Sequence, residues 1–184
     1  KLYGLGSNDA GGALVSLLAC FNYFYKNPNL KYNLLMVASA EEETAGDKSL
    51  RYLIPYLPKI DFAIIGEPTQ MELAIAEKGL VVFDIEIKGT PSHAAHPNKD
   101  NPLMKLPEII KKIENISFEK VSPILGPVKL TLTQINAGSQ HNVVPSEVKL
   151  VLDVRVNECY QNHEIDEVIQ KALPCNVKAR SLHL

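Results

Sequence analysis

Residues 80–88, with the sequence LVVFDIEIK, are the segment from which the fold can be worked out. Apolar and polar side chains alternate along most of this segment, which is the period of a strand with one buried and one solvated face. Before it, the apolar runs of the chain are continuous rather than alternating. The change of pattern near residue 78 therefore predicts that a second domain begins there.

The segments that follow predict a complete small domain over residues 78–184. The apolar residues of residues 102–115 recur every three or four positions, as in a helix packed on one side. Residues 128–135 and 148–156 are expected strands, residues 161–173 an expected helix and residues 176–179 an expected strand. This βαββαβ order is that of a ferredoxin-like α+β fold, an antiparallel sheet with two helices on one face.

Residues 1–77 predict an α/β domain with a mostly parallel sheet. We expect helices over residues 10–25 and 47–57, and buried strands over residues 33–40 and 61–65. The first residues, from Lys1 to Gly6, have the pattern of the end of a strand whose beginning is absent. We therefore expect this domain to be an incomplete part of a longer chain.

Composition excludes several classes of function. The chain has 184 residues, 46% of them hydrophobic, and a net charge of −2. No basic cluster larger than Lys111–Lys112 occurs, so binding to nucleic acid or to an anionic membrane is not expected. The apolar runs are too short for a transmembrane helix. Three cysteines without CxxC spacing favour reduced thiols and a soluble cytoplasmic protein.

Carboxylates follow the apolar runs of the first domain. Asp9, the triplet 41–43 and Glu67 each come just after a strand-like segment, and ligands gather at the carboxyl ends of strands in open α/β sheets. Glu41, Glu42 and Glu43 also fit a solvated helix N-terminus. The convergence of three acidic segments instead favours a divalent metal site.

The choice of metal stays open at this point. Carboxylates alone suit magnesium or calcium, whereas zinc usually also takes imidazole, and residues 1–77 contain no histidine. In a hydrolytic metal site one of two adjacent carboxylates coordinates, and its neighbour takes a proton from water. A dinucleotide site at Gly4-x-Gly6 is excluded, because Asp9 replaces the third glycine and would repel a pyrophosphate.

Five motifs occur in order along the chain and together carry a resemblance. They are YGLGSNDAGG at residues 3–12, AEEET at 40–44, IIGEPT at 64–69, GTPSHAAHP at 89–97 and NVVP at 142–145. In this order they resemble the motifs of the co-catalytic di-zinc aminoacylases and deacylases. That family includes acetylornithine deacetylase, succinyl-diaminopimelate desuccinylase and carboxypeptidase G.

The resemblance implies roles for the acidic residues. Asp9 would bridge two zinc ions, with cobalt as a possible replacement. Glu43 and Glu67 would each hold one metal ion, and Glu42 would be the general base. A cis peptide bond is expected at Asp9–Ala10. The family also has one histidine ligand upstream of Asp9 and one beyond residue 184, and neither occurs in this sequence.

The second domain would then be the lid and dimerisation domain of the family. The resemblance implies that His93 stabilises the oxyanion at the scissile carbonyl, from the partner subunit of a homodimer. His96 has no such match and is expected to be an ordinary surface residue. Asn142 and Arg155 match residues that contact substrate carboxylates, although Arg155 by itself also fits an exposed or paired strand residue.

The expected function is metal-dependent hydrolysis of an N-acyl amino acid, a small-molecule substrate. The segments at residues 40–44 and 64–69 are most similar to acetylornithine deacetylase, which suggests N-acetylornithine and arginine biosynthesis. Another N-acyl amino acid or a dipeptide is the alternative within the family. A non-catalytic dimerisation module, whose first domain binds no metal, is the alternative from a different class.

Overall fold

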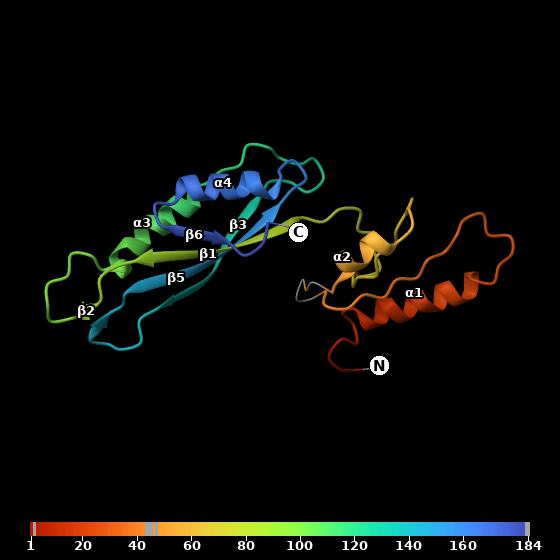
Figure 1. Cartoon of the computed structure of the whole chain (residues 1–184), viewed down its shortest axis with the longest axis horizontal. Helices are drawn as coiled ribbons and strands as arrows, with labels where there is room; N and C mark the ends of the chain where they lie inside the picture. Colours follow the sequence, from red (N-terminus) through yellow and green to blue (C-terminus); the bar gives the residue numbers. More distant parts are fainter. Residues whose placement is uncertain (2, 43–45, 47, 183–184) are drawn as a thin grey trace. The chain divides into compact units, whose positions relative to one another are not determined.

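The chain folds into two compact units, Lys1–Ala74 and Ile75–Leu184. The computed structural model describes residue 1, residues 3–42, residue 46 and residues 48–182. Figure 1 shows the elements of both units. Each unit is described by itself below.

A four-stranded antiparallel sheet is the centre of the second unit. Its strands are β1 (Gly79–Lys88), β3 (Lys129–Ala137), β5 (Glu147–Val156) and β6 (Asn176–Ala179), in the order β3-β5-β1-β6. Helices α3 (Pro102–Glu114) and α4 (Asn162–Ala172) lie on the same face of the sheet (Figure 1). The predicted ferredoxin-like fold is therefore confirmed.

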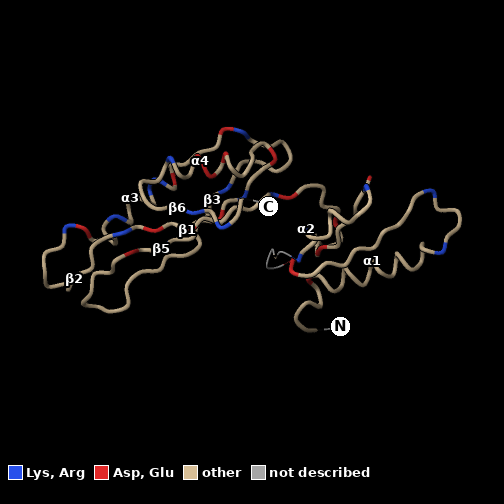
Figure 2. The backbone as a smooth tube through the Cα atoms, in the orientation of Figure 1, with Lys and Arg blue, Asp and Glu red and all other residues tan. Residues whose placement is uncertain are grey.

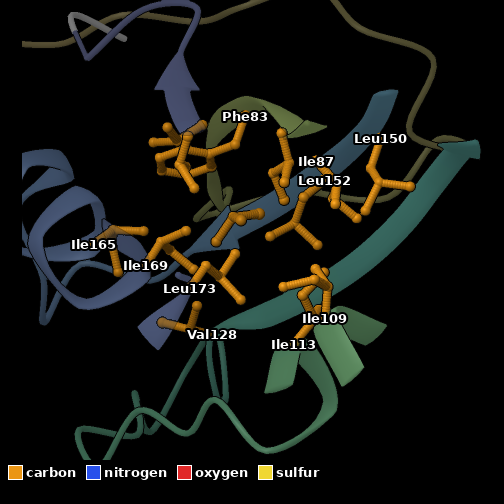
Figure 3. Packing of buried hydrophobic residues seen from close by; sticks show 14 of the residues in the cluster. Phe83, Ile87, Ile109, Ile113, Val128, Leu150, Leu152, Ile165, Ile169 and Leu173 are labelled. Carbon is orange, nitrogen blue, oxygen red and sulfur yellow. The ribbon is translucent and has the colours of Figure 1, made fainter. Parts of the chain in front are cut away.

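The alternating pattern of β1 sends every second side chain into the core. Val81, Phe83, Ile85 and Ile87 are at most 2% exposed, and the residues between them face away from the helices. Strand β5 has the same alternation, and the register places Phe83 opposite Leu152. Figure 3 shows these side chains packed with isoleucines of both helices, among them Ile109, Ile113, Ile165 and Ile169.

Side chains at their N-termini fix where the two helices begin. Asn101 caps α3, because its Oδ1 accepts a hydrogen bond of 2.9 Å from the backbone N–H of Leu103. Pro102 occupies the first turn, where no N–H partner is needed. Gln161 and Glu164 form a reciprocal capping box at the start of α4.

The first unit contains α1 (Gly11–Phe24), α2 (Leu50–Leu53) and a 3₁₀ turn (Ile54–Tyr56). The predicted helix over residues 10–25 is confirmed. The second predicted helix is shorter than expected: Pro55 has no N–H to continue the α-helical hydrogen bonds, and the chain goes on as the 3₁₀ turn. None of the described helices is long and apolar enough to cross a membrane.

The predicted strands at residues 33–40 and 61–65 do not form. Within the described part of the first unit no segment is hydrogen-bonded as a strand. A strand needs a neighbour to satisfy its backbone, and here the two runs do not pair with each other. Their apolar side chains stay exposed, with Leu35 at 53% and Ile65 at 76%.

The alternation in β5 generates a stability prediction. Leu152→Ala should lower the free energy of unfolding by about 2–5 kcal/mol, because it leaves a cavity in the core. Val151→Ala is the matched control on the other face and should cost about 1 kcal/mol or less. Urea unfolding followed by far-UV circular dichroism measures both, and equal losses would contradict the assignment of the two faces.

Candidate functional site

Asp9 lies in a tight loop immediately before α1. The backbone N–H of Gly11 donates to the carbonyl oxygen of Gly6 at 2.9 Å, which closes this loop. A Cβ at position 11 would lie 2.4 Å from that oxygen, so only glycine fits there. The Asp9–Ala10 peptide bond is cis, as the family resemblance implies, and Asp9 is exposed.

The acidic triplet is described only in part. Glu41 adopts a positive φ of 60°, and its Oε2 accepts a hydrogen bond of 3.1 Å from the backbone N–H of Lys48. Its carbonyl oxygen accepts a hydrogen bond from Gly46. Glu41 therefore organises the loop, whereas Glu42 is exposed. Glu43, the expected metal ligand, lies outside the described residues.

Glu67 follows a residue that packs closely on α1. A Cβ at Gly66 would lie 2.8 Å from Cδ1 of Leu17 and 3.1 Å from Cβ of Ala13. The segment that carries exposed Glu67 therefore contacts the first turns of the helix that Asp9 precedes. The structure brings these two acidic segments to the same helix.

The described acidic residues do not by themselves build a metal centre. Across the described ranges, no three His, Cys, Asp or Glu side chains are grouped closely enough to hold a metal ion. The carboxylates of Asp9 and Glu67 supply oxygen donors, and the described part of the first unit contains no histidine to supply the imidazole that zinc usually takes. Asp9 and Glu67 alone thus do not fit the expected pair of zinc ions, and we derive no reaction step through a metal.

His93 and Asn142 are brought together in the second unit by a two-stranded sheet. Strand β2 (Ser92–His93) pairs with β4 (Val143–Val144), and His93 is opposite Val143. The backbone N–H of Ala94 donates to the carbonyl oxygen of Asn142 at 2.9 Å. As a result the side-chain Nδ2 of Asn142 lies 3.5 Å from Nε2 of His93.

The turn after β2 orients the His93 ring. The backbone N–H of Ala95 donates to Nδ1 of His93 at 3.2 Å, and this shorter contact favours the tautomer with the proton on Nε2 over the one in which Nε2 accepts from Asn142 Nδ2 at 3.5 Å. The backbone N–H of His96 donates to the carbonyl oxygen of His93 at 3.0 Å and closes the turn. In the tautomer with the proton on Nε2, both Nε2–H and the Nδ2 group of Asn142 can donate to an oxyanion, which is what stabilising one requires.

Arg155 is not near this pair. It lies close to the end of β5, about 26 Å of strand beyond Glu147, the β5 residue next to β4. Its guanidinium donates to both carboxylate oxygens of Asp153, at 2.9 Å and 3.2 Å. Within the second unit, the three residues expected to act on substrate thus separate into a pair, His93 with Asn142, and a distant ion pair.

A hollow of about 360 Å³ lies beside β4. Its lining includes Gly138, Ser139, Val143, Glu147 and Lys149. Val143 is the residue paired with His93, so the hollow adjoins the His93–Asn142 pair. Its charged lining residues are Glu147 and Lys149, so the hollow has one acidic and one basic side chain.

Sequence reasoning missed the polar residues of the loop that carries His93. Asn98 and Asp100 are half-buried and hydrogen-bonded within this loop. The available signal was Asn-Lys-Asp-Asn between two prolines, residues 97 and 102, which is typical of turns held by side-chain hydrogen bonds.

Comparison with known proteins relates this geometry to a family. The model of the M20 peptidase dimerisation domain matches residues 75–178. Succinyl-diaminopimelate desuccinylase of Rickettsia canadensis is 30% identical over 182 residues, which cover 92% of this chain and 47% of that protein. The same enzyme of Pelagibacter ubique is 28% identical, with 92% and 47% covered.

A solved structure was also found, an M20 family metallo-carboxypeptidase from Sulfolobus solfataricus. It is 12% identical with a TM-score of 0.43, covering 56% of this chain and 42% of that one. The chain spans about half the length of the curated relatives it matches. Since the dimerisation-domain match covers more than half of the 184 residues, the chain belongs to the M20 family of peptidases and related amidohydrolases.

Proposed function

We propose that the protein containing this chain is a metal-dependent hydrolase of the amide bond of an N-acyl amino acid. One observation carries the proposal: the dimerisation-domain match at residues 75–178 lies directly after a segment with the acidic motifs of Asp9, Glu42 and Glu67. A chain that served only as a dimerisation module would have no need of these motifs.

Two acyl amino acids are the substrates to consider. The relatives that are 28–30% identical to this chain are succinyl-diaminopimelate desuccinylases, which favours an N-succinyl diamino acid. The motif at residues 64–69 resembles acetylornithine deacetylase, which favours N-acetylornithine. We give the first precedence, because its similarity extends over 92% of the chain rather than over the two short segments at residues 40–44 and 64–69.

Glu42 and His93 would perform the proton transfer and the charge stabilisation. Water attacks the amide carbon, and Glu42 takes the proton that the water loses. When the C–N bond breaks, Glu42 passes that proton to the leaving amine nitrogen. His93 donates its Nε2–H to the carbonyl oxygen as negative charge develops there, and Asn142, 3.5 Å away, assists in binding the same group.

The proposed cofactor is a pair of zinc ions, with cobalt as a substitute. Asp9, Glu43 and Glu67 would be this chain's ligands, and histidines outside these 184 residues would complete the site. We place the protein in the cytoplasm, where reduced cysteines such as Cys20, Cys159 and Cys175 are usual. Figure 2 shows basic and acidic residues interspersed along the chain, which fits a small-molecule substrate better than a nucleic acid.

The second unit would form a homodimer. Among the described strands, β3 is an edge of the sheet, with a hydrogen-bonded neighbour on one side only. Ile135 on β3 is 50% exposed, and an exposed apolar side chain on a free edge strand favours association with another chain. An antiparallel arrangement of two copies would use the same surface twice.

The substrate proposal is tested with the full-length protein and added zinc. We expect hydrolysis of N-succinyl-diaminopimelate with a higher kcat/KM than that of N-acetylornithine, measured by release of the free amine. Chelation should abolish turnover and zinc should restore it. A reversed preference would identify N-acetylornithine as the substrate, and hydrolysis of neither would argue against both assignments.

Glu42→Gln should lower kcat by about 10²–10⁴-fold, because the amide cannot take the proton from water. Glu41→Gln is the matched control. The side chain of Glu41 accepts a hydrogen bond from the backbone N–H of Lys48, and glutamine keeps an oxygen that can accept it. Steady-state kinetics of the two full-length variants compare their kcat values and so test the role of Glu42 as the general base. Equal losses would show that the loop, and not the base, had been damaged.

Mixing two inactive variants tests whether His93 serves the partner subunit. If it does, a heterodimer of Glu42→Gln and His93→Ala chains has one site with both groups intact. Co-refolding equal amounts should then restore about a quarter of wild-type activity, since half of the dimers are mixed and each has one working site of two. If His93 serves its own subunit, the mixture should remain as inactive as its components.

A further inference from the structure

We propose that Asn98 is a positioning residue for His93. Its side-chain amide ties together both ends of the loop between β1 and α3, and so fixes the two-residue strand β2 that carries the histidine. This inference rests on the proposed function of His93 and names a residue that acts through it.

The side chain of Asn98 uses all of its polar atoms on this loop. Its Nδ2 donates to the carbonyl oxygen of Thr90 at 2.8 Å and to Oγ of Ser92 at 2.8 Å. Its Oδ1 accepts a hydrogen bond of 2.7 Å from the backbone N–H of Asp100. One half-buried amide therefore connects the residue before His93 to both sides of the loop.

A second layer of contacts anchors the residues that Asn98 holds. Asp100 accepts a hydrogen bond from Oγ1 of Thr90 at 2.9 Å, and its carbonyl oxygen accepts the backbone N–H of Thr90 at 2.9 Å. Lys105 on α3 donates both to Asp100 and to the carbonyl oxygen of Lys88 at the end of β1. Hydrogen bonds from Lys105 first, and then from Thr90, lower the pKa of Asp100.

Hydrogen bonds thus connect the loop to β1 and α3 as far as the residue before His93. Strand β1 ends at Lys88, whose carbonyl oxygen is held by the Lys105 ammonium. The backbone then passes Thr90 and Ser92, two of the three residues to which Asn98 is hydrogen-bonded. Exposed His93 follows Ser92, and its ring is contacted from the same turn, by the His96 ring at 5.8 Å between centroids and by the backbone N–H of Ala95. Its orientation depends on the backbone on either side of it.

Only an amide satisfies all three contacts. Alanine would remove them all, and aspartate would keep the acceptor for Asp100 but remove both N–H donors. The carbonyl oxygen of Thr90 would then lose its donor from position 98 and face a carboxylate. A displacement of about 1 Å at a reacting group can cost about 100-fold in rate. Loss of the three hydrogen bonds of Asn98 should therefore lower the rate of the reaction.

The test compares two asparagines of the same loop in the full-length protein. Asn98→Ala should lower kcat by about 10–100-fold with KM changed less than about threefold. Asn101→Ala removes the N-cap of α3 without a contact to the His93 turn, so it should lower the melting temperature but leave kcat unchanged. A similar kcat for both variants would overturn the proposal.

A double-mutant cycle separates positioning from general loss of structure. His93→Ala alone should lower kcat by about 10²–10³-fold. Adding Asn98→Ala to it should lower kcat by less than about twofold more, because the group that Asn98 positions is already gone. Full multiplication of the two losses would show that Asn98 acts elsewhere. If Asn98→Ala does not fold, Asn98→Asp takes its place in both experiments.

A spectroscopic measurement keeps this inference separate from the proposed hydrolase activity. With ¹⁵N-labelled histidine, the wild-type His93 signal, assigned by its absence in His93→Gln, should show Nδ1 as an acceptor and the proton on Nε2. In Asn98→Ala the signal should change to a mixture of both tautomers. An unchanged signal would refute the positioning role, whether or not the protein hydrolyses an amide.

Discussion

The antiparallel pairing of β1 with β5 is the interaction on which the second unit depends. Ten residues of β1 are in register with ten of β5, so one face of both strands is apolar along its whole length. A slip by one residue would send Phe83 and Leu152 to solvent and bring the charged face toward the helices. The register therefore fixes the core, and through the core it fixes where each connecting loop begins.

The position of His93 depends on the same constraint through the end of β1. Strand β1 is bonded to β5 along its whole length and to β6 from Phe83 to Glu86, and the Lys105 ammonium holds the carbonyl oxygen of its last residue. Lys88 pairs with Glu147, which brings the loop after β1 beside the segment before β5. The small β2–β4 sheet forms where these two segments meet. His93 and Asn142, far apart in sequence, come together there as a consequence of sheet geometry.

The sequence predicts the second unit well and the first unit poorly, for a physical reason. In β1 and α3 the apolar periodicity is local, and the chain itself supplies every partner strand and helix. At residues 33–40 the apolar run is equally clear, but a buried strand also requires neighbours, and the described residues supply none. Periodicity reports the preference of a segment, whereas a strand forms only when its backbone is paired. The same limit applies to the acidic residues, since Asp9 and Glu67 are expected to be ligands from their motifs alone, and the described residues form no cluster of three donors around them.

The loop between β1 and α3 shows a finer limit of sequence reasoning. Asn98 and Asn101 are three residues apart, and both are typical of turns and caps. Asn101 bonds forward to Leu103 and starts a helix, whereas Asn98 bonds back to Thr90 and Ser92 and holds the strand before His93. Nothing in residue type or spacing separates a residue that begins a helix from one that holds the strand carrying His93. The distinction follows from the direction of the hydrogen bonds, and that direction is set by how the finished sheet places the two ends of the loop.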